Sequence, residues 1–388
     1  MMNLKQTAYN KIEETLDIKQ IDPRITERDR KIFAAVSATQ LTDEQQEWIC
    51  SPDKTFPRQE DVLAVHWHPE TIPFHLIEKR FETLFPNARR SLIIPTQHNQ
   101  IKTFGDFCGV EVDCYSPQFK RKVQLLLHFS RDKLSDCDQL NRMLAHTFQY
   151  RSSQLLDFIS TIVDEEHEDK LEEAAAVTGA GEQLVEFVRI YTRKIRSMID
   201  ENIHDIQPDM LKNKLLRNYF DLLRGDYPDA LIDRVKVFLK AVKKIVKRGF
   251  NYEFFYRTEE IIEEARAIGA GVVVPHPEQF WPILLAEYDV DGYEVWNPQS
   301  QEYTEFLIHV VRQKNEGQNR GGRRLLVFMG DDCHLGEKIK PVRSRDRVKA
   351  AREVGVQPAW EDPVIRKALI SAGFSRGNVI EEYIQRLT

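Results

Sequence analysis

The sequence predicts an α/β protein built on a barrel of seven strands, with a large helical insertion and helical segments at both ends. Seven short runs rich in valine, isoleucine and leucine have the length of buried strands. Helical patterns such as "FHLIEKRFETLF" and "TEEIIEEARAIGAG" lie between several of these runs, as expected for parallel strands joined by crossover helices. The seven runs are "DVLAVH", "SLIIPTQH", "GVEVDCY", "KVQLLLHF", "AGVVVPHP", "VDGYEVWN" and "RRLLVFMGDD".

The strand runs fall in two separated stretches of the chain, residues 59–130 and 257–340, which together form the predicted barrel. Residues 131–256 carry long amphipathic helical patterns instead. A structureless loop of that length is improbable within a compact domain, so we expect a helical insertion. Residues 1–58 are expected to form an N-terminal helical extension, and residues 341–388 a C-terminal helical region.

Several helix ends are marked by local signals. Thr42 and Gln45 have the spacing of a capping box, which predicts a helix start within "LTDEQQEWIC". Asp362 followed by Pro363 predicts another helix start, and Gly373 suits the position just past the end of that helix.

Composition narrows the class of protein. The chain has 388 residues, 41% of them apolar and 30% charged, which indicates a globular protein with a sizeable core. A net charge of −6 gives no general reason to expect nucleic acid or an anionic membrane as a partner. No window approaches the ~18 apolar residues of a membrane span, and the N-terminus lacks a signal-peptide core, so the cytoplasm is the expected location. Five scattered cysteines without a C-x-x-C pair predict reduced thiols.

Side chains that can bind metals occur at or near the end of almost every predicted strand. In "HWH", His66 and His68 are two residues apart, so an extended chain directs both imidazoles to the same side. Asp332 and His334 have the same spacing in "GDDCH". Because barrel enzymes gather their chemistry at the C-terminal ends of the strands, these groups are expected to converge. The other candidates in this series are His98, Glu111, His128, His276 and Glu294.

Taken in order, the motifs "HWH", "TQH", "GVEVD", "LLLH", "PHP", "GYEVWN" and "GDDCH" resemble those of the polymerase and histidinol phosphatase (PHP) superfamily. The resemblance covers about residues 61–335, interrupted by the helical insertion. It implies a distorted seven-stranded (β/α) barrel that binds two or three divalent ions, such as zinc, manganese or iron.

The resemblance also implies a ligand set for each ion. His66, His68, Glu111 and Asp332 would hold the first ion. Glu111 would bridge to a second ion completed by His128 and His276. His98 and His334 would hold a third, together with a histidine from the first loop, for which the candidate is His75, although Glu70 lies nearby. Glu111, Asp332 and His334 are the residues that the resemblance places in catalysis.

The sequence departs from the family pattern at three positions. Ala64 and Gln97 replace acids that usually lie close to the ligands, and such losses weaken metal affinity by about one or two decades. Asp331 is an added acid. Each single motif also has a structural interpretation, since His128 could be a core histidine and "GDDCH" a turn. Glu70 and Glu278 could be solvated loop acids.

Metal ions bridged in this way favour phosphate ester hydrolysis by a shared hydroxide. The expected substrate is a small phosphorylated molecule or a nucleotide. Two alternatives stay open: amidohydrolase-type hydrolysis at carbon, and a non-catalytic metal-binding module. A basic helical stripe at residues 234–248 could bind nucleic acid, but a solvated helix face explains it as well. The sequence does not predict an oligomeric state.

Overall fold

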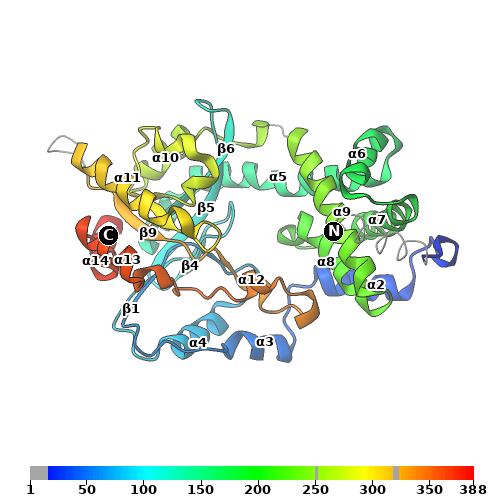
Figure 1. The fold of residues 1–388 in the computed structure, drawn as a ribbon, viewed down its shortest axis with the longest axis horizontal. Coiled ribbons are helices and arrows are strands. Elements are labelled where there is room, and N and C mark those ends of the chain that lie inside the picture. Colours follow the sequence, from blue (N-terminus) through cyan, green and yellow to red (C-terminus); the bar gives the residue numbers. More distant parts are fainter. Residues whose placement is uncertain (1–15, 250–251, 318–322) are drawn as a thin grey trace. The chain divides into compact units, whose positions relative to one another are not determined.

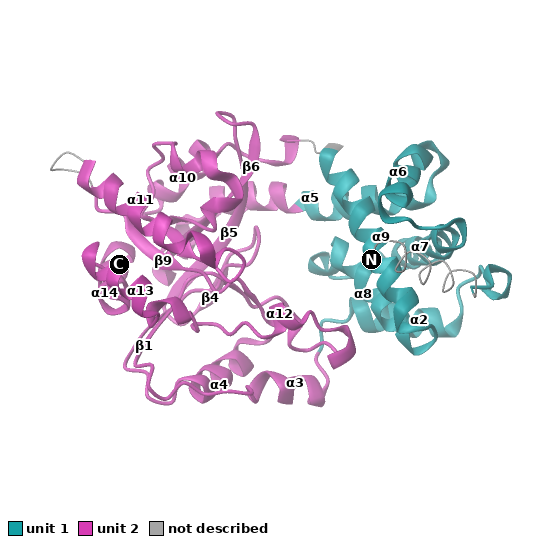
Figure 2. Ribbon diagram, in the orientation of Figure 1, with its two compact units in different colours: residues 1–40, 149–251 teal, residues 41–148, 252–388 magenta. Residues whose placement is uncertain are grey.

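The computed structural model of the chain describes residues 16–249, 252–317 and 323–388. The chain divides into two compact units (Figure 2). Unit 1 comprises residues 1–40 and 149–251, and unit 2 comprises residues 41–148 and 252–388. The residues 1–58 that the sequence groups as one extension are therefore divided between the two units at residue 40.

Unit 2 contains all the strands of the described residues. All seven predicted runs form strands, and three short strands, β2, β4 and β10, accompany them. The strands are β1 (Asp61–Ala64), β2 (Trp67–His68), β3 (Arg90–Ile93), β4 (Lys102–Phe104), β5 (Phe107–Ser116), β6 (Arg121–Ser130), β7 (Gly271–Val274), β8 (Gly292–Trp296), β9 (Leu326–Met329) and β10 (Cys333–His334).

Hydrogen bonds join these strands into three sheets. Strands β4-β5-β6-β7-β8-β9 form a six-stranded sheet, while β1 pairs with β3 and β10 pairs with β2. A closed seven-stranded barrel stays a prediction, because the ladders of the described residues do not join into one ring.

The strand directions are mixed. The expected parallel pairing is found for β7-β8-β9, β1-β3 and β2-β10, but β4, β5, β6 and β7 pair antiparallel. Only four residues, 117–120, separate β5 from β6. A crossover helix needs a dozen or more residues, so these two strands can only form a hairpin.

Helices cover the strands of unit 2. Helix α10 (Thr258–Ala267) packs on β5 and β7, and α11 (Thr304–Gly317) packs on β8 and β9. Helix α14 (Arg376–Leu387) contacts both the six-stranded sheet and the β1-β3 pair, and it lies beside β9 in Figure 1. The C-terminal region is therefore part of the core. The remaining helices of this unit are α3 (Asp43–Cys50), α4 (Phe74–Leu84), α12 (Arg347–Ala350) and α13 (Pro363–Ser371).

The expected helix ends are confirmed. Thr42 and Gln45 form the capping box of α3. The Asp362 carboxylate accepts hydrogen bonds from two amides in the first turn of α13, and Gly373 follows that helix with φ of 76°, which glycine adopts without strain.

Unit 1 is helical. Its helices are α2 (Glu27–Ser37), α6 (Glu168–Thr178), α7 (Glu182–Asn202), α8 (Asn213–Leu222), α9 (Asp229–Val246) and most of α5 (Asp138–Val163), which begins in unit 2. The apolar faces of these helices enclose a separate hydrophobic core. Within it, Lys194 donates to Asp29 over 2.9 Å, and Tyr219 donates to the same carboxylate over 2.8 Å.

All five cysteines are free thiols, as predicted. Within the described residues, no helix combines the length and the apolar character needed to cross a membrane.

Candidate metal centre

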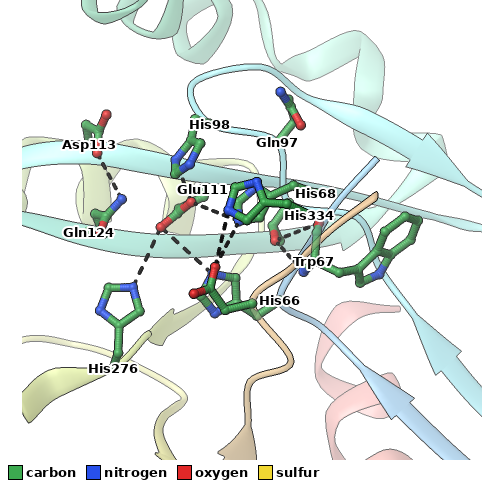
Figure 3. A network of polar contacts seen from close by, with 12 residues as sticks. His66, Trp67, His68, Gln97, His98, Glu111, Asp113, Gln124, His276 and His334 are labelled. Carbon is green, nitrogen blue, oxygen red and sulfur yellow. Dashed lines mark hydrogen bonds and ion pairs between the residues drawn. The ribbon is translucent and has the colours of Figure 1, made fainter. Parts of the chain in front are cut away.

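Seven of the predicted ligands come together in unit 2, and Figure 3 labels all of them except Asp332. His66 lies between β1 and β2, His98 follows β3, and His276 follows β7. The hydrogen-bonded ladders bring these remote segments side by side. The complete set is His66, His68, His98, Glu111, His276, Asp332 and His334.

The pairing of β2 with β10 explains why the two spaced motifs "HWH" and "DCH" share one site. His68 pairs with His334 and Trp67 pairs with Cys333 in parallel register. The rings of His68 and His334 stack with centroids 4.1 Å apart. Because side chains alternate along a strand, Trp67 and Cys333 face the other way, into the core, where both are fully buried.

Backbone strain is concentrated at this site. Five non-glycine residues of the described chain have positive φ, and three of them, Glu70, His276 and Asp332, lie within the cluster or against it. Such conformations cost about 1–3 kcal/mol each and persist only where surrounding structure imposes them. The strained backbone at these residues lowers local stability, and it directs their side chains toward the cluster.

Glu111 on β5 is the central carboxylate. Its Oε1 lies 3.9 Å from His66 Nε2 and 3.9 Å from His276 Nε2. Its Oε2 lies 3.5 Å from His68 Nε2 and 2.6 Å from His98 Nδ1. The two oxygens thus face different pairs of histidines, which is the arrangement a bridging ligand requires.

The seven side chains form three overlapping groups, and within each group the donor atoms lie within 4.8 Å of one another. The groups overlap at His66 and His68, so the cluster is continuous. The groups are His66, His68 and Asp332; His66, Glu111 and His276; and His68, His98 and His334.

Glu294 on β8 lies outside the three groups and contacts two of their histidines, His66 and His276. Its Oε1 lies 2.5 Å from His66 Nδ1, and its Oε2 accepts a hydrogen bond from the His276 amide over 2.9 Å. A proton held on His66 Nδ1 leaves Nε2 directed at Glu111. The sequence presents Glu294 as a possible ligand, whereas the structure shows it orienting two ligands.

The electrostatics of the site follow from its burial and charge. Burial alone would lower the pKa of His66, but the adjacent Glu294 raises it to about 10. Burial and the nearby rings of His334 and His98 hold the pKa of His68 well below its usual value. Burial would raise the pKa of Glu111, yet the surrounding histidines keep it well below its usual range. Glu111 is therefore ionised and His68 neutral, which are the protonation states of metal ligands.

The donor set fits divalent cations. Among the described residues, the His66 Nε2 atom and both ring nitrogens of His68 are buried without a hydrogen-bond partner. A buried polar atom without a partner costs about 1–3 kcal/mol, which coordination would offset. Imidazole and carboxylate donors together suit zinc, manganese or iron.

Asp332 has two partners that sequence reasoning missed. Arg352 Nη1 donates to Asp332 Oδ2 over 2.8 Å, and Gln299 Nε2 donates to the same oxygen over 2.6 Å. No sequence signal pointed to Arg352, because it lies twenty residues downstream in a segment that reads only as helical.

Two of the predicted ligands lie outside the three groups. His128 has both ring nitrogens occupied, since Nε2 donates to the Val65 carbonyl over 2.9 Å and Nδ1 accepts from the Tyr383 hydroxyl over 2.8 Å. Burial lowers the pKa of His128 to about 3, so it is a neutral core histidine here. His75 is exposed on α4. The structure places Glu70 nearer, with its Oε1 3.3 Å from His334 Nδ1.

The structure shows the surroundings of Ala64, Gln97 and Asp331, the three positions at which the resemblance implied other residues. Ala64 is fully buried in the core of β1. The Gln97 side chain accepts a hydrogen bond from the Glu70 amide and so fixes the strained turn at Glu70. Asp331 accepts from the Gly355 amide and the Gln357 side chain, and burial raises its pKa well above the usual value. Asp331 is therefore tied to the C-terminal region, and Glu278 also lies outside the three groups.

No protein-family model matches the chain, and no curated protein matches its sequence. A crystal structure from Bifidobacterium adolescentis, of a protein provisionally described as a metal-dependent phosphoesterase, aligns with 84% of this chain and 98% of its own chain. The aligned residues are 14% identical and the TM-score is 0.40. A similarity of this size carries no argument about function.

Proposed function

We propose that this protein is a metal-dependent phosphoesterase that acts on a small phosphorylated molecule or a nucleotide. The observation that supports the proposal is the buried cluster of five histidines, Glu111 and Asp332, arranged in three overlapping groups of donor atoms. Two or three divalent ions held there would activate a water molecule and neutralise the charge of a phosphate group.

The residues of the chain have distinct parts in this proposal. Glu111 would bridge ions through its two oxygens, since each faces a different pair of imidazoles. The hydrogen bond between His66 Nδ1 and Glu294 leaves Nε2 facing the cluster, where an ion would bind after displacing the proton that a pKa of about 10 keeps on the ring. A metal-activated water would serve as the nucleophile. Cys333 is unsuited to that role, because it is buried facing the core and burial raises the pKa of its thiol to about 12.

Metal content and phosphatase activity test the proposal together. Protein purified without chelator is expected to contain more than one equivalent of zinc, manganese or iron by elemental analysis. With added Mn²⁺ or Zn²⁺ it should release phosphate from at least one ester in a panel. Because His66 belongs to two donor groups, His66→Ala should lower kcat/KM by about 100-fold or more.

His75→Ala is the matched control, because His75 is an exposed imidazole outside the cluster, and it should leave both readouts unchanged. Protein without bound ions and without activity would contradict the proposal. Hydrolysis of amides but not of phosphate esters would favour chemistry at carbon, and tightly held but inert ions would favour a non-catalytic module.

A further inference from the structure

The C-terminal segment of residues 352–357 packs against the connection between β9 and β10 that contains Asp332. Asp331 accepts hydrogen bonds from Gly355 N over 2.9 Å and from Gln357 Nε2 over 2.8 Å. The Cys333 thiol donates to the Arg352 carbonyl over 3.3 Å. The residues on both sides of Asp332 are therefore bonded to this segment, which lies outside the barrel region that the sequence predicts.

The Arg352 side chain contacts both the main chain and the carboxylate of Asp332. Nη1 of Arg352 donates to the Asp332 carbonyl oxygen over 2.9 Å and to Oδ2 over 2.8 Å. Asp332 has φ of 42°, a conformation that a non-glycine residue keeps only under constraint. The double contact from one guanidinium supplies such a constraint.

The two carboxylate oxygens of Asp332 have different surroundings. Oδ2 accepts from Arg352 and from Gln299. Oδ1 faces the cluster, 3.7 Å from His68 Nε2 and 3.4 Å from His334 Nε2. With Oδ2 occupied by two donors, Oδ1 is the oxygen presented to the histidines.

We propose that Arg352, assisted by Gln299, is a positioning residue of the metal centre that makes Asp332 a single-oxygen ligand. This inference rests on the proposed function, because it presumes that the cluster binds metal ions. Residues that bind the far atom of a metal ligand fix its orientation, and their loss typically weakens metal affinity by about 10–100-fold. Arg352 is 8% exposed, so its contacts are made out of solvent, where a charged hydrogen bond is strongest.

The experiment measures Zn²⁺ affinity by competition with a chromophoric chelator, together with the visible absorption of the Co²⁺ form as a report on coordination. Arg352→Gln removes the charge and shortens the side chain, and we expect Zn²⁺ to bind about 10–100-fold more weakly and the Co²⁺ spectrum to change. Arg352→Lys keeps the charge and should recover part of the lost affinity. Arg347→Gln is the matched control, because Arg347 is an exposed arginine five residues away.

Gln299→Ala keeps the inference testable if Arg352→Gln fails to fold, because Gln299 is exposed and its loss leaves the core intact. It should weaken Zn²⁺ binding in the same direction by a smaller factor. Wild-type affinity and an unchanged Co²⁺ spectrum in both variants would overturn the inference. A raised KM for a phosphate ester without a change in Zn²⁺ affinity would overturn it too, since Arg352 would then bind substrate. A wild-type protein that binds no Zn²⁺ would overturn the proposed function and this inference together.

Discussion

Gly330 leaves space for the carboxylate of Glu294 beside the candidate site. A Cβ atom added at Gly330 would overlap the carboxylate of Glu294, which is bonded to His66. Glycine at this position is therefore explained by the close approach of Glu294, and the chain has no room for any larger side chain without moving that carboxylate.

We expect Gly330→Ala to lower the free energy of unfolding by about 1–3 kcal/mol, the usual cost of overpacking, and to weaken Zn²⁺ binding. Urea unfolding and a Zn²⁺ titration measure the two effects. Gly317→Ala is the control, because a Cβ at that position meets nothing within 4 Å. Unchanged Zn²⁺ affinity in Gly330→Ala would show that Glu294 does not orient His66.

The hydrogen bond between His128 and Tyr383 could not be predicted from local sequence patterns. The position of His128 at the end of an apolar strand allowed either a metal ligand or a core histidine. Its neighbours on β5 and β7 are Gly109 and Gly271. A Cβ at Gly271 would overlap the Tyr383 hydroxyl, so the missing side chain makes room for the tyrosine that binds His128. That tyrosine is 255 residues away in sequence, and no local pattern could reveal the pairing.

Tyr383→Phe should lower the free energy of unfolding by about 1–3 kcal/mol, because it leaves the buried Nδ1 of His128 without a donor. The zinc content per chain should not change, since His128 lies outside the three donor groups. Tyr303→Phe, at a tyrosine that is 38% exposed, is the control for stability. Loss of one equivalent of zinc in Tyr383→Phe would indicate that His128 is a metal ligand after all.

At the scale of elements, the strands and helix ends were predictable because their signals are local. All seven predicted strand runs are found, and the capping residues Thr42 and Asp362 begin helices where expected. The direction of pairing was predictable only where connections are long. The hairpin of β5 and β6 was missed, because apolar runs identify a buried strand without showing which neighbour it joins.

The core of unit 1 contains a buried ion pair between Asp29 of α2 and Lys194 of α7. Burial would raise the pKa of Asp29, but hydrogen bonds from Lys194, Thr26 and Tyr219 hold that pKa below its usual range.

The basic stripe on α9 has structural partners within unit 1. Arg234 donates to the carbonyls of Thr178 and Gly179 at the end of α6, and Lys236 pairs with Asp221.

A lowered pKa in the folded state predicts the pH dependence of unit 1. The stabilisation from Asp29 is complete above the unfolded pKa of about 3.9 and is lost as the pH falls through the lower, folded value. Asp29→Asn should therefore be about 3 kcal/mol less stable than wild type at pH 7, because it leaves Lys194 buried without its counter-ion. The difference should shrink toward zero below pH 4.

Urea unfolding followed by circular dichroism at 222 nm, from pH 7 to pH 3, measures this dependence. Asp200→Asn, at an exposed acid on the same helix as Lys194, should differ little from wild type at every pH. A stability difference for Asp29→Asn that stays constant through pH 3 would contradict the linkage.

At the scale of the whole molecule, the two units have separate hydrophobic cores. The buried clusters of unit 2 contain residues of unit 2 alone, and the cluster of unit 1 contains residues of unit 1 alone. The sequence predicted a separate helical insertion from the loss of strand runs, but it did not predict that residues 16–40 would pack with that insertion. Helices of similar amphipathicity give no local sign of which core they join.

The distribution of tryptophan makes the separation of the units measurable. All five tryptophans, Trp48, Trp67, Trp281, Trp296 and Trp360, belong to unit 2, which also holds the metal-binding cluster. An ion that binds only the folded state stabilises it by about 2.7 kcal/mol when its free concentration is 100 times Kd. Adding chelator to the metal-loaded protein should therefore move the urea midpoint of tryptophan fluorescence to lower urea.

Asp29→Asn supplies the complementary measurement, because its effect should be confined to unit 1. We expect it to lower the unfolding midpoint of part of the signal at 222 nm while leaving the fluorescence midpoint and its response to chelator unchanged. If Asp29→Asn and chelator instead shift both signals equally, the chain unfolds as a single cooperative structure, and the two cores are not independent.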